Sequence, residues 1–467
     1  MQEPQSSVPH LSRVLNSFEV MLLAFSALSP AASVFIGAAG VLHLAGSGAA
    51  IAFVAGGVIA AVIALLYAEL GAAFPRAGGP YPSVTGILGP WAGFPYVAIL
   101  MLAAPFFMGF AALGLADYLR VLVPALPSVP IMVVSLVLAS AIAILDVRRG
   151  AFVTGLFLAV ESAALLILAG VAVLHPVRPL GEVLMHPVFL DGGVLTAVPA
   201  ALLGLAVISG AWACAGASWA MYFGEEMKDA SRRIGRVIGW VGALASLTIA
   251  GPVVLVLLSA RDLPGVLGAE APFAAYLSEA SGPVTAAIVS IGVVAAIFNN
   301  LIAASMGLSR FIYATGRDRL WPSLVNRILA HLHPRLKTPI TATVLLCAGS
   351  ALIGLLGEQI MLIVLSGEDV FNTLLISLAV LSGRWRGLTG AFFRAPIHPL
   401  IPLFGLFLTA AFIWTDWLDA DAGRPSVLLL AGVFLGGLVY YRLRLRWTAP
   451  DLSPAVSAVA LTPESGD

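Results

Sequence analysis

Phe25-Ser-Ala-Leu-Ser-Pro-Ala-Ala-Ser33 lies in the middle of the first long apolar run of the chain, which extends from residue 18 to about residue 43. This run is long enough to cross a bilayer as a helix. Pro30 has no backbone N–H and crowds the carbonyl four residues before it, so we expect the helix to be interrupted there. In a membrane, open backbone is tolerated where it is buried in protein or lines an aqueous cavity. The stretch therefore predicts either a broken helix of the kind at which transporters bind substrate, or a simple proline kink.

The composition of the 467-residue chain is that of a polytopic membrane protein. Apolar residues make up 60% of the chain and charged residues 10%, and the mean hydropathy is +1.01, far from the values of soluble domains. The membrane class, rather than the net charge of zero, argues against a nucleic-acid partner. The seven histidines show no metal-ligand spacing, and we find no catalytic constellation. We therefore expect neither a metal site nor an enzyme.

Twelve apolar spans follow one another along the chain. They cover residues 18–43, 48–74, 84–120, 127–145, 151–174, 195–222, 237–259, 283–313, 339–356, 359–382, 398–415 and 426–445. Each is long enough to cross a bilayer, and the third and eighth are long enough to tilt or overhang.

The basic residues predict the orientation of these spans. With a cytoplasmic N-terminus, 20 of the 24 Lys and Arg residues fall on the inside, and only Arg120, Arg178, Arg261 and Arg424 fall outside. The inside set consists of Arg13, Arg76, Arg148, Arg149, Lys228, Arg232, Arg233, Arg236, Arg310, Arg317, Arg319, Arg327, Arg335, Lys337, Arg384, Arg386, Arg394, Arg442, Arg444 and Arg446. A missed span would scramble this split, because it would reverse every later loop. Both termini are therefore expected in the cytoplasm.

The sixth span is weakened in the same way as the first. It contains Ser209-Gly210-Ala-Trp-Ala-Cys-Ala-Gly216, a run of small residues about twelve residues from its start. Small residues can serve close helix packing, but glycine also permits open backbone. Because five is an odd number of crossings, two five-span units would have opposite topologies, as inverted repeats require. We expect residues 29–33 and 209–213 to be non-helical and to face each other across a cavity.

Three further segments carry a resemblance to a known family. Tyr67-Ala-Glu-Leu-Gly-Ala-Ala-Phe-Pro-Arg-Ala-Gly-Gly-Pro-Tyr81 resembles the link between the second and third helices of amino acid–polyamine–organocation (APC) permeases. Gly216 with Glu225-Glu-Met-Lys-Asp-Ala-Ser-Arg-Arg233 is similar to the sixth helix and following loop of that superfamily. Ser309-Arg-Phe-Ile-Tyr-Ala-Thr-Gly-Arg-Asp318, with Leu320-Trp-Pro322 and Lys337-Thr-Pro339, resembles the segment between its helices eight and nine.

The resemblance implies an all-α fold like that of the bacterial leucine transporter, with 12 transmembrane helices in a 5+5 inverted repeat plus two extra helices. The corresponding parts are a cytoplasmic N-terminal segment (1–17), a first repeat (18–174), a second repeat (195–382), helices 11 and 12 (398–446) and a cytoplasmic C-terminal tail (447–467). It also implies alternating access without an organic cofactor, with substrate held between the first and sixth helices.

In such permeases the broken first helix offers backbone N–H groups to a substrate carboxylate, which helix-end dipoles favour. The glycine-rich run of the family is replaced here by Leu28-Ser-Pro-Ala-Ala-Ser33, and Pro30 removes one donor. Trp212 matches an aromatic gate that covers the substrate, although simple packing is the alternative. The candidate substrate-binding residues are Phe25, Ser26, Ser29, Ala31, Ala32, Ser33, Ser209, Gly210, Trp212, Ala213 and Ser218.

Glu161 is the candidate for proton coupling. It lies near the middle of the fifth span, and the nearest charged residues are Arg149 and Arg178. An ionisable group at that depth is costly and points to a function. Because burial disfavours the charged form, the side chain could take up and release a proton. Three roles stay open: proton coupling, pairing with a cationic substrate, or hydrogen bonding to a neighbouring helix as a neutral acid.

Other acidic residues lie within or beside the spans. Glu368 and Asp369 form an acidic point in the tenth span, where they could attract a cation. Adjacent helix positions point about 100° apart, so we do not expect both to face one site. Glu69, near the cytoplasmic end of the second span, is expected to hydrogen-bond structurally or to pair with Arg76.

Asn299 and Asn300 interrupt the eighth span and form a possible ion site. A hard cation prefers several oxygen ligands, which asparagines can supply. The hydroxyl pair of sodium-coupled relatives is absent, so we favour hydrogen bonding between helices.

Together, these features predict a multi-pass secondary transporter of the cytoplasmic (inner) membrane. It would carry amino acids or related organic amines by proton symport or exchange, with sodium as the second choice of coupling ion and membrane lipid as its surroundings. A polyamine or organic-amine antiporter is the alternative, because the spans carry acids without a partnering lysine. A non-transporting membrane sensor with the same fold is a further alternative.

Overall fold

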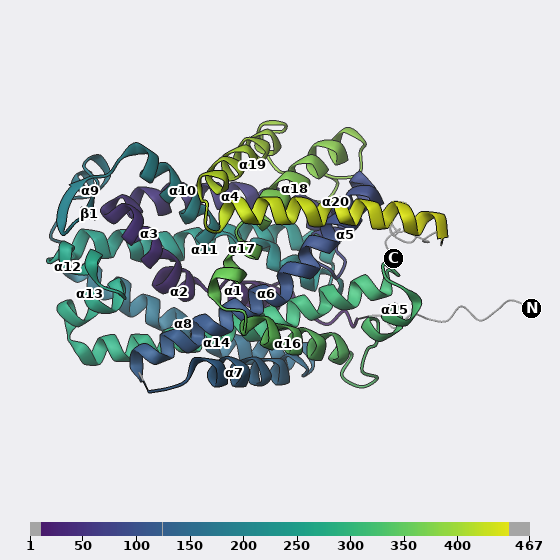
Figure 1. Ribbon diagram of the computed structural model, residues 1–467, viewed down its shortest axis with the longest axis horizontal. Coiled ribbons are helices and arrows are strands. Elements are labelled where there is room, and N and C mark those ends of the chain that lie inside the picture. Colours follow the sequence, from purple (N-terminus) through teal and green to yellow (C-terminus); the bar gives the residue numbers. More distant parts are fainter. Residues whose placement is uncertain (1–10, 124, 448–467) are drawn as a thin grey trace, which may run out of the picture.

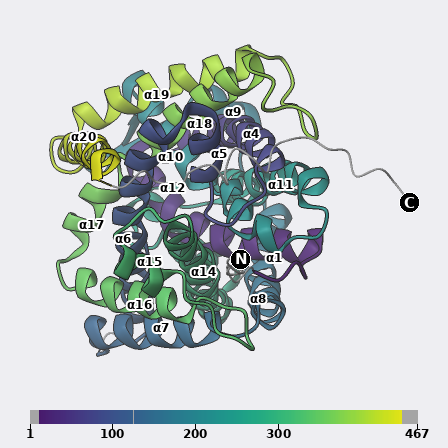
Figure 2. The ribbon, with the colours of Figure 1, turned by 90° about the vertical axis from the view of Figure 1, so that its right-hand side faces the viewer.

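The computed structural model describes residues 11–123 and 125–447, which form a bundle of helices. Most of the long helices run along the longest dimension of the molecule (Figure 1), and Figure 2 shows several of them end-on. The predicted segments at residues 1–10 and 448–467 lie outside the described residues.

Helices follow one another along almost the whole described chain. The first part contains α1 (Ser17–Leu28), α2 (Pro30–Ala32), the π-helical turn η1 (Ser33–Gly37), α3 (Ala38–Ala45), the 3-10 turn η2 (Gly46–Gly48), α4 (Ala49–Ala73), α5 (Tyr81–Leu88), α6 (Pro90–Leu122), α7 (Ser128–Ala143) and α8 (Val147–Leu174). The middle part contains α9 (Leu180–Met185), β1 (Val188–Asp191), β2 (Val194–Ala197), α10 (Ala200–Cys214), the 3-10 helix η3 (Ala217–Glu226), α11 (Ala230–Ser259), α12 (Leu263–Gly268), α13 (Pro272–Ser281) and α14 (Pro283–Arg317). The last part contains α15 (Ser323–Leu329), α16 (Ile340–Gly354), α17 (Glu358–Leu365), α18 (Glu368–Trp385), α19 (Leu400–Leu418) and α20 (Gly423–Trp447).

Helices cover each of the predicted apolar spans, with differences at some ends. Within the described residues, nine helical stretches are long and apolar enough to cross a membrane. The first of them, Ser17–Ala73, contains two predicted spans, and the shorter apolar helices α7 and α16 match two more. The sixth predicted span begins too early, because its first residues belong to the hairpin β1–β2.

Small residues bring the central helices into close contact. A Cβ atom on Gly56 of α4 would lie 2.4 Å from the backbone nitrogen of Ala211 in α10. In the same interface, a Cβ on Gly210 would lie 2.6 Å from the carbonyl oxygen of Ala52. Only glycine permits such an approach of two helix backbones. The small residues of the sixth span therefore serve packing against α4.

The two ends of the bundle differ. α5, α15 and the C-terminal end of α20 lie at one end, on the right in Figure 1, whereas α9, β1, α12 and α13 lie at the other. We call the end with α5, α15 and the C-terminal end of α20 the basic end, because most of the Lys and Arg residues predicted for the inside occur in the segments that meet there.

Candidate functional site

The first helix is broken at Ser29. This residue has a left-handed backbone, with φ of 53°, and separates α1 from α2. Its N–H closes the last turn of α1 by donating to the carbonyl of Phe25 at 2.8 Å, and its own carbonyl accepts from the N–H of Ser33 at 3.0 Å. Pro30 is the first residue of the next helix, a position where its missing N–H costs nothing. The predicted break is therefore confirmed at Ser29, whereas residues 30–33 are helical.

The break in the sixth span lies later than we expected. α10 runs through residues 209–213 as a regular helix, so the prediction of open backbone there is wrong. The physical reason is the packing of Gly210 and Ala211 on α4, which needs a continuous helix surface. The chain opens instead at Ala215 and Gly216, where Gly216 has φ of 140°, and the 3-10 helix η3 follows.

The two breaks lie against each other. A Cβ on Gly216 would lie 2.8 Å from the side chain of Leu28, the last residue of α1. A Cβ on Gly37, which follows the first break, would lie 3.4 Å from the Cβ of Ala213, which precedes the second. The juxtaposition predicted from the paired weak points is thus present. The cavity between them stays a prediction.

Glu161 of α8 reaches the broken first helix directly. Its carboxylate oxygen Oε1 accepts a hydrogen bond from the backbone N–H of Ala31 at 2.8 Å and from the hydroxyl of Ser29 at 3.0 Å. The side chain is fully buried. A negative group is favoured at the start of a helix, so Glu161 stabilises the restart of the helix after Ser29.

The second oxygen of Glu161 has no hydrogen-bond partner among the described residues. Asn299 of α14 interacts with the same carboxyl group, yet both polar atoms of its buried side-chain amide also lack hydrogen bonds of normal geometry. An unpaired acidic oxygen next to an unpaired amide is a costly arrangement in a protein interior. The unpaired oxygen of Glu161 could carry a proton, which would remove the cost of its buried charge.

Asn300 serves the other side of the break. Its side-chain amide donates to the carbonyl of Ala27 at 2.5 Å, near the end of α1 where carbonyls lose their helical partners. The hydroxyl of Ser29 also lies 3.3 Å from the carbonyl of Ala296. For Asn300, the expectation of hydrogen bonding between helices is confirmed. The sequence did not show that α8 and α14 both meet the same broken turn.

The remaining predicted site residues occupy different surroundings. Phe25 and Ser218 are half-buried, Ser26 donates to the carbonyl of Thr154 at 3.3 Å, and Ser209 donates within its own helix to Leu205 at 3.1 Å. Trp212 is 52% exposed, so its indole is not packed into the core.

A third break occurs in the tenth span and was not predicted. α17 ends at Leu365 and α18 begins at Glu368, and the N–H of Gly367 donates to the hydroxyl of Ser426 at 2.7 Å. Glu368 and Asp369 therefore lie in the first turn of α18, where the helix dipole favours acids. The dipeptide Ser366-Gly367 was the available sequence signal.

These acids belong to a polar cluster between several helices. Asn372 donates to Glu368 at 3.2 Å and accepts from the hydroxyl of Tyr96 at 2.7 Å. Both acids also interact electrostatically with Tyr67 of α4. Neither forms an ion pair with a described basic residue.

A helical membrane bundle with paired helix breaks, one of them held by a buried acid, is an arrangement also found in transporters built on discontinuous helices. The chain matches the family model for amino acid permeases over residues 15–433. It belongs to this family and is a membrane permease of the APC superfamily.

Individual relatives are similar over most of their length. The chain is 28% identical to human Asc-type amino acid transporter 1 over 431 residues, covering 88% of this chain and 79% of that protein. It is 25% identical to a branched-chain amino acid permease of Lactococcus lactis over 436 residues, covering 85% and 87%. It is 26% identical to the branched-chain amino acid permease of Bacillus subtilis over 469 residues, covering 92% and 93%.

Proposed function

We propose that this permease moves amino acids or related organic amines across the cytoplasmic membrane and that Glu161 couples this movement to protons. The observation that carries the proposal is the contact of the buried Glu161 carboxylate with Ala31 N–H and Ser29 Oγ at the break of the first helix. The amino acid substrates in the names of the relatives support the substrate class.

The coupling follows from what a proton does to this contact. Ionised Glu161 is a strong acceptor for the N–H of Ala31 and holds the start of α2 against α8. Protonation weakens that acceptor and removes the cost of a buried charge. The ionised and the protonated form of Glu161 therefore favour different positions of the broken first helix. A proton that binds Glu161 from one side of the membrane and is released to the other side shifts the equilibrium between these two positions.

The membrane arrangement is also proposed. We infer twelve crossings in two inverted units of five plus two, with the basic end and both termini in the cytoplasm. The paired breaks and the 20 basic residues on one side of the predicted spans support it. Reporter fusions after residues 192, 282 and 421 should report the outside, and fusions after residues 229 and 333 the inside.

An organic amine without a carboxylate is the second candidate substrate. Glu161 already occupies the N–H of Ala31, and Pro30 has none, so fewer donors stay for a substrate carboxylate. The acids Glu368 and Asp369 add negative charge without an ion-pair partner among the described residues. A thermal-shift screen of the purified protein against amino acids and amines distinguishes the two, because a ligand that binds the folded state raises its stability.

The decisive experiment uses the ligand from that screen in proteoliposomes. Glu161→Gln keeps the acceptor for Ala31 but cannot release a proton, so accumulation driven by a pH gradient should fall to the level of protein-free liposomes. Exchange of internal for external substrate should persist. The matched control is Glu182→Gln in α9, an exposed acid, which should accumulate substrate normally. If the Glu161 variant accumulates substrate with the wild-type pH profile, proton coupling through this residue is wrong.

A further inference from the structure

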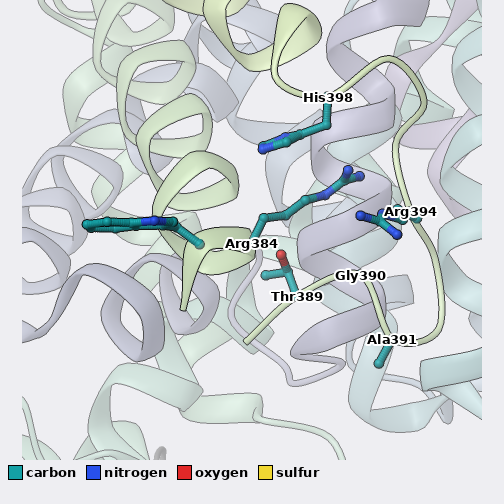
Figure 3. A pocket seen from close by; sticks show the side chains of 7 residues that line it. Arg384, Thr389, Gly390, Ala391, Arg394 and His398 are labelled. Carbon is teal, nitrogen blue, oxygen red and sulfur yellow. The ribbon is translucent and has the colours of Figure 1, made fainter. Parts of the chain in front are cut away.

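The basic end carries a pocket that is separate from the helix breaks. It has a volume of about 450 Å³ and lies between the end of α18 and the loop that leads to α19. Arg384, Arg394 and His398 line it together with Thr389. Figure 3 shows the two guanidinium groups close together in the view, with the imidazole above them.

Glu69 fixes Arg384 at the base of this pocket. Its buried carboxylate accepts from Nε and Nη2 of Arg384 at 2.7 and 2.5 Å, from the hydroxyl of Thr389 at 2.8 Å and from the N–H of Ala395 at 2.9 Å. Of the two roles expected for Glu69, structural hydrogen bonding is confirmed. The pairing with Arg76 is wrong, because Arg384 in the last turn of α18, 315 residues later, is the ion-pair partner. Each oxygen of Glu69 accepts two hydrogen bonds, so this acid has no lone pair left for another cation.

Positive charge remains in the pocket after this pairing. Nη1 of Arg384 makes no hydrogen bond within the described residues, although the side chain is buried. Arg394 is exposed and forms no ion pair there. Partial burial, with the positive charges of Arg384 and Arg394, lowers the pKa of the His398 imidazole, and Glu69 opposes this only in part. Glu69 balances the charge of Arg384 only, so the unpaired guanidinium of Arg394 gives the pocket a net positive charge that attracts an anion.

Exposed apolar side chains occur in the same segment of the chain as the residues that line the charged pocket, and we call them its apolar rim. Trp385, which lines the pocket, is 93% exposed, and Ile397 is 67% exposed. Phe392 and Leu400 of the same loop region are exposed as well. Tryptophan and basic residues gather at the level of lipid headgroups, whereas an aqueous phosphate site needs no apolar rim.

We propose that this pocket binds the phosphate group of an anionic membrane lipid. Arg394 and His398 contact the phosphate oxygens, the free Nη1 of Arg384 donates from the base, and the apolar rim lies against the acyl chains. Arginine suits this role because its planar fork binds phosphate through two hydrogen bonds. The same cations would attract inorganic phosphate, so the test must separate the two sources.

The test measures binding of a fluorescent short-chain phosphatidylglycerol to the purified full chain in a neutral detergent. Unlabelled phosphatidylglycerol should compete, whereas phosphatidylcholine and inorganic phosphate at the same concentration should not. The double variant Arg394→Gln/His398→Gln should raise the Kd by about ten- to a hundredfold at pH 5.5, since the charge of the guanidinium and that of the protonated imidazole are lost. Arg384 is left intact because it holds Glu69.

The matched control is Arg327→Gln/His331→Gln in and after α15, which removes the same residue types at the same spacing from the same end of the bundle. Both double variants change exposed side chains and should unfold at the wild-type temperature. Equal loss of binding in the two double variants would overturn the proposal, since it would show nonspecific attraction to the basic end. Equal competition by inorganic phosphate would overturn the assignment to lipid.

Discussion

At the scale of single residues, a mutation of Trp212 can distinguish a gate that covers the substrate from a side chain that only packs between helices. Its indole is 52% exposed, so truncation removes little core contact. We expect Trp212→Ala to fold normally and to weaken substrate binding by about 1–3 kcal/mol, because a large aromatic that covers a ligand contributes much of the contact area. Isothermal titration with the ligand from the thermal-shift screen measures this.

Trp240→Ala is the control for Trp212→Ala, because Trp240 is also exposed but lies in α11 away from the breaks in sequence. It should bind substrate as the wild type does. Unchanged binding and uptake by a well-folded Trp212→Ala variant would mean that this residue is not a gate.

His398 should make lipid binding depend on pH. The charged groups that act on it are Arg384, Arg394 and Glu69, and they lower its pKa overall. The protonated imidazole attracts an anion more strongly than the neutral one, so binding favours proton uptake by His398 and must strengthen as pH falls. We expect the Kd for phosphatidylglycerol to be several-fold lower at pH 5.5 than at pH 8, since both arginines stay charged throughout.

The variant His398→Gln isolates this effect, because glutamine can still donate a hydrogen bond but does not titrate. Its Kd should change little between the two pH values. A pH dependence as steep as that of the wild type would place the titrating group elsewhere.

At the scale of elements, the helix breaks show which features of the fold could be predicted from the sequence and which could not. The broken first helix was predictable, because Pro30 interrupts an apolar span and Ser29 can adopt a left-handed conformation beside it. In the sixth span the small residues serve two different structural roles. Gly210 allows contact with α4, and Gly216 opens the chain. Composition alone cannot distinguish a glycine that admits a neighbour from one that needs positive φ.

The partners of the buried acids were beyond prediction for a different reason. Glu161 was expected to be buried and important, but its contact with Ala31 joins residues 130 positions apart. Glu69 likewise finds Arg384 across 315 positions. The hydropathy pattern around each acid predicts the helix that carries it and its depth in the membrane. The neighbour that each one meets depends on how whole helices pack, which hydropathy does not encode.

Gly216 provides a direct test of the second break. Its φ of 140° is unfavourable for any residue with a Cβ, and that atom would lie 2.8 Å from Leu28. We expect Gly216→Ala to lower the free energy of unfolding by about 1–3 kcal/mol and to impair transport. Gly239→Ala in α11 is the control, because a Cβ there meets no atom within 4 Å. A thermal unfolding temperature for Gly216→Ala as high as that of Gly239→Ala would show that the break tolerates a side chain.

At the scale of the whole molecule, the basic end is tied together by segments from distant parts of the chain. The N–H of Leu15 donates to the carbonyl of Glu226 at 2.9 Å, and the N–H of Lys228 donates to the carbonyl of Leu15 at 2.9 Å. The guanidinium of Arg148 reaches the carbonyl of Val14 at 2.9 Å. The segment before α1 is thereby fixed to the end of η3 and to the start of α8, so the two broken helices cannot separate at this end without releasing it.

The buried ion pair of Arg310 and Glu226 lies beside these contacts, because the carbonyl of Glu226 also binds the segment before α1. Arg310 of α14 donates to both carboxylate oxygens of Glu226, with Nη2 at 3.1 Å from Oε1, and donates through Nη1 to the carbonyl of Met306 at 2.8 Å. Removing one partner leaves a buried charge without compensation, so Arg310→Met should lower the free energy of unfolding by about 3–5 kcal/mol. Replacing both residues by apolar ones removes that penalty, and Arg310→Met/Glu226→Leu should therefore regain most of the unfolding temperature.

The control is Arg233→Met, whose pair with Asp229 is exposed and worth at most about 1 kcal/mol. Thermal unfolding of the four purified proteins in one detergent measures the series. If Arg310→Met unfolds at the temperature of Arg233→Met, the buried pair is worth no more than an exposed one. If the double variant is no more stable than Arg310→Met, the loss does not come from an unpaired buried charge.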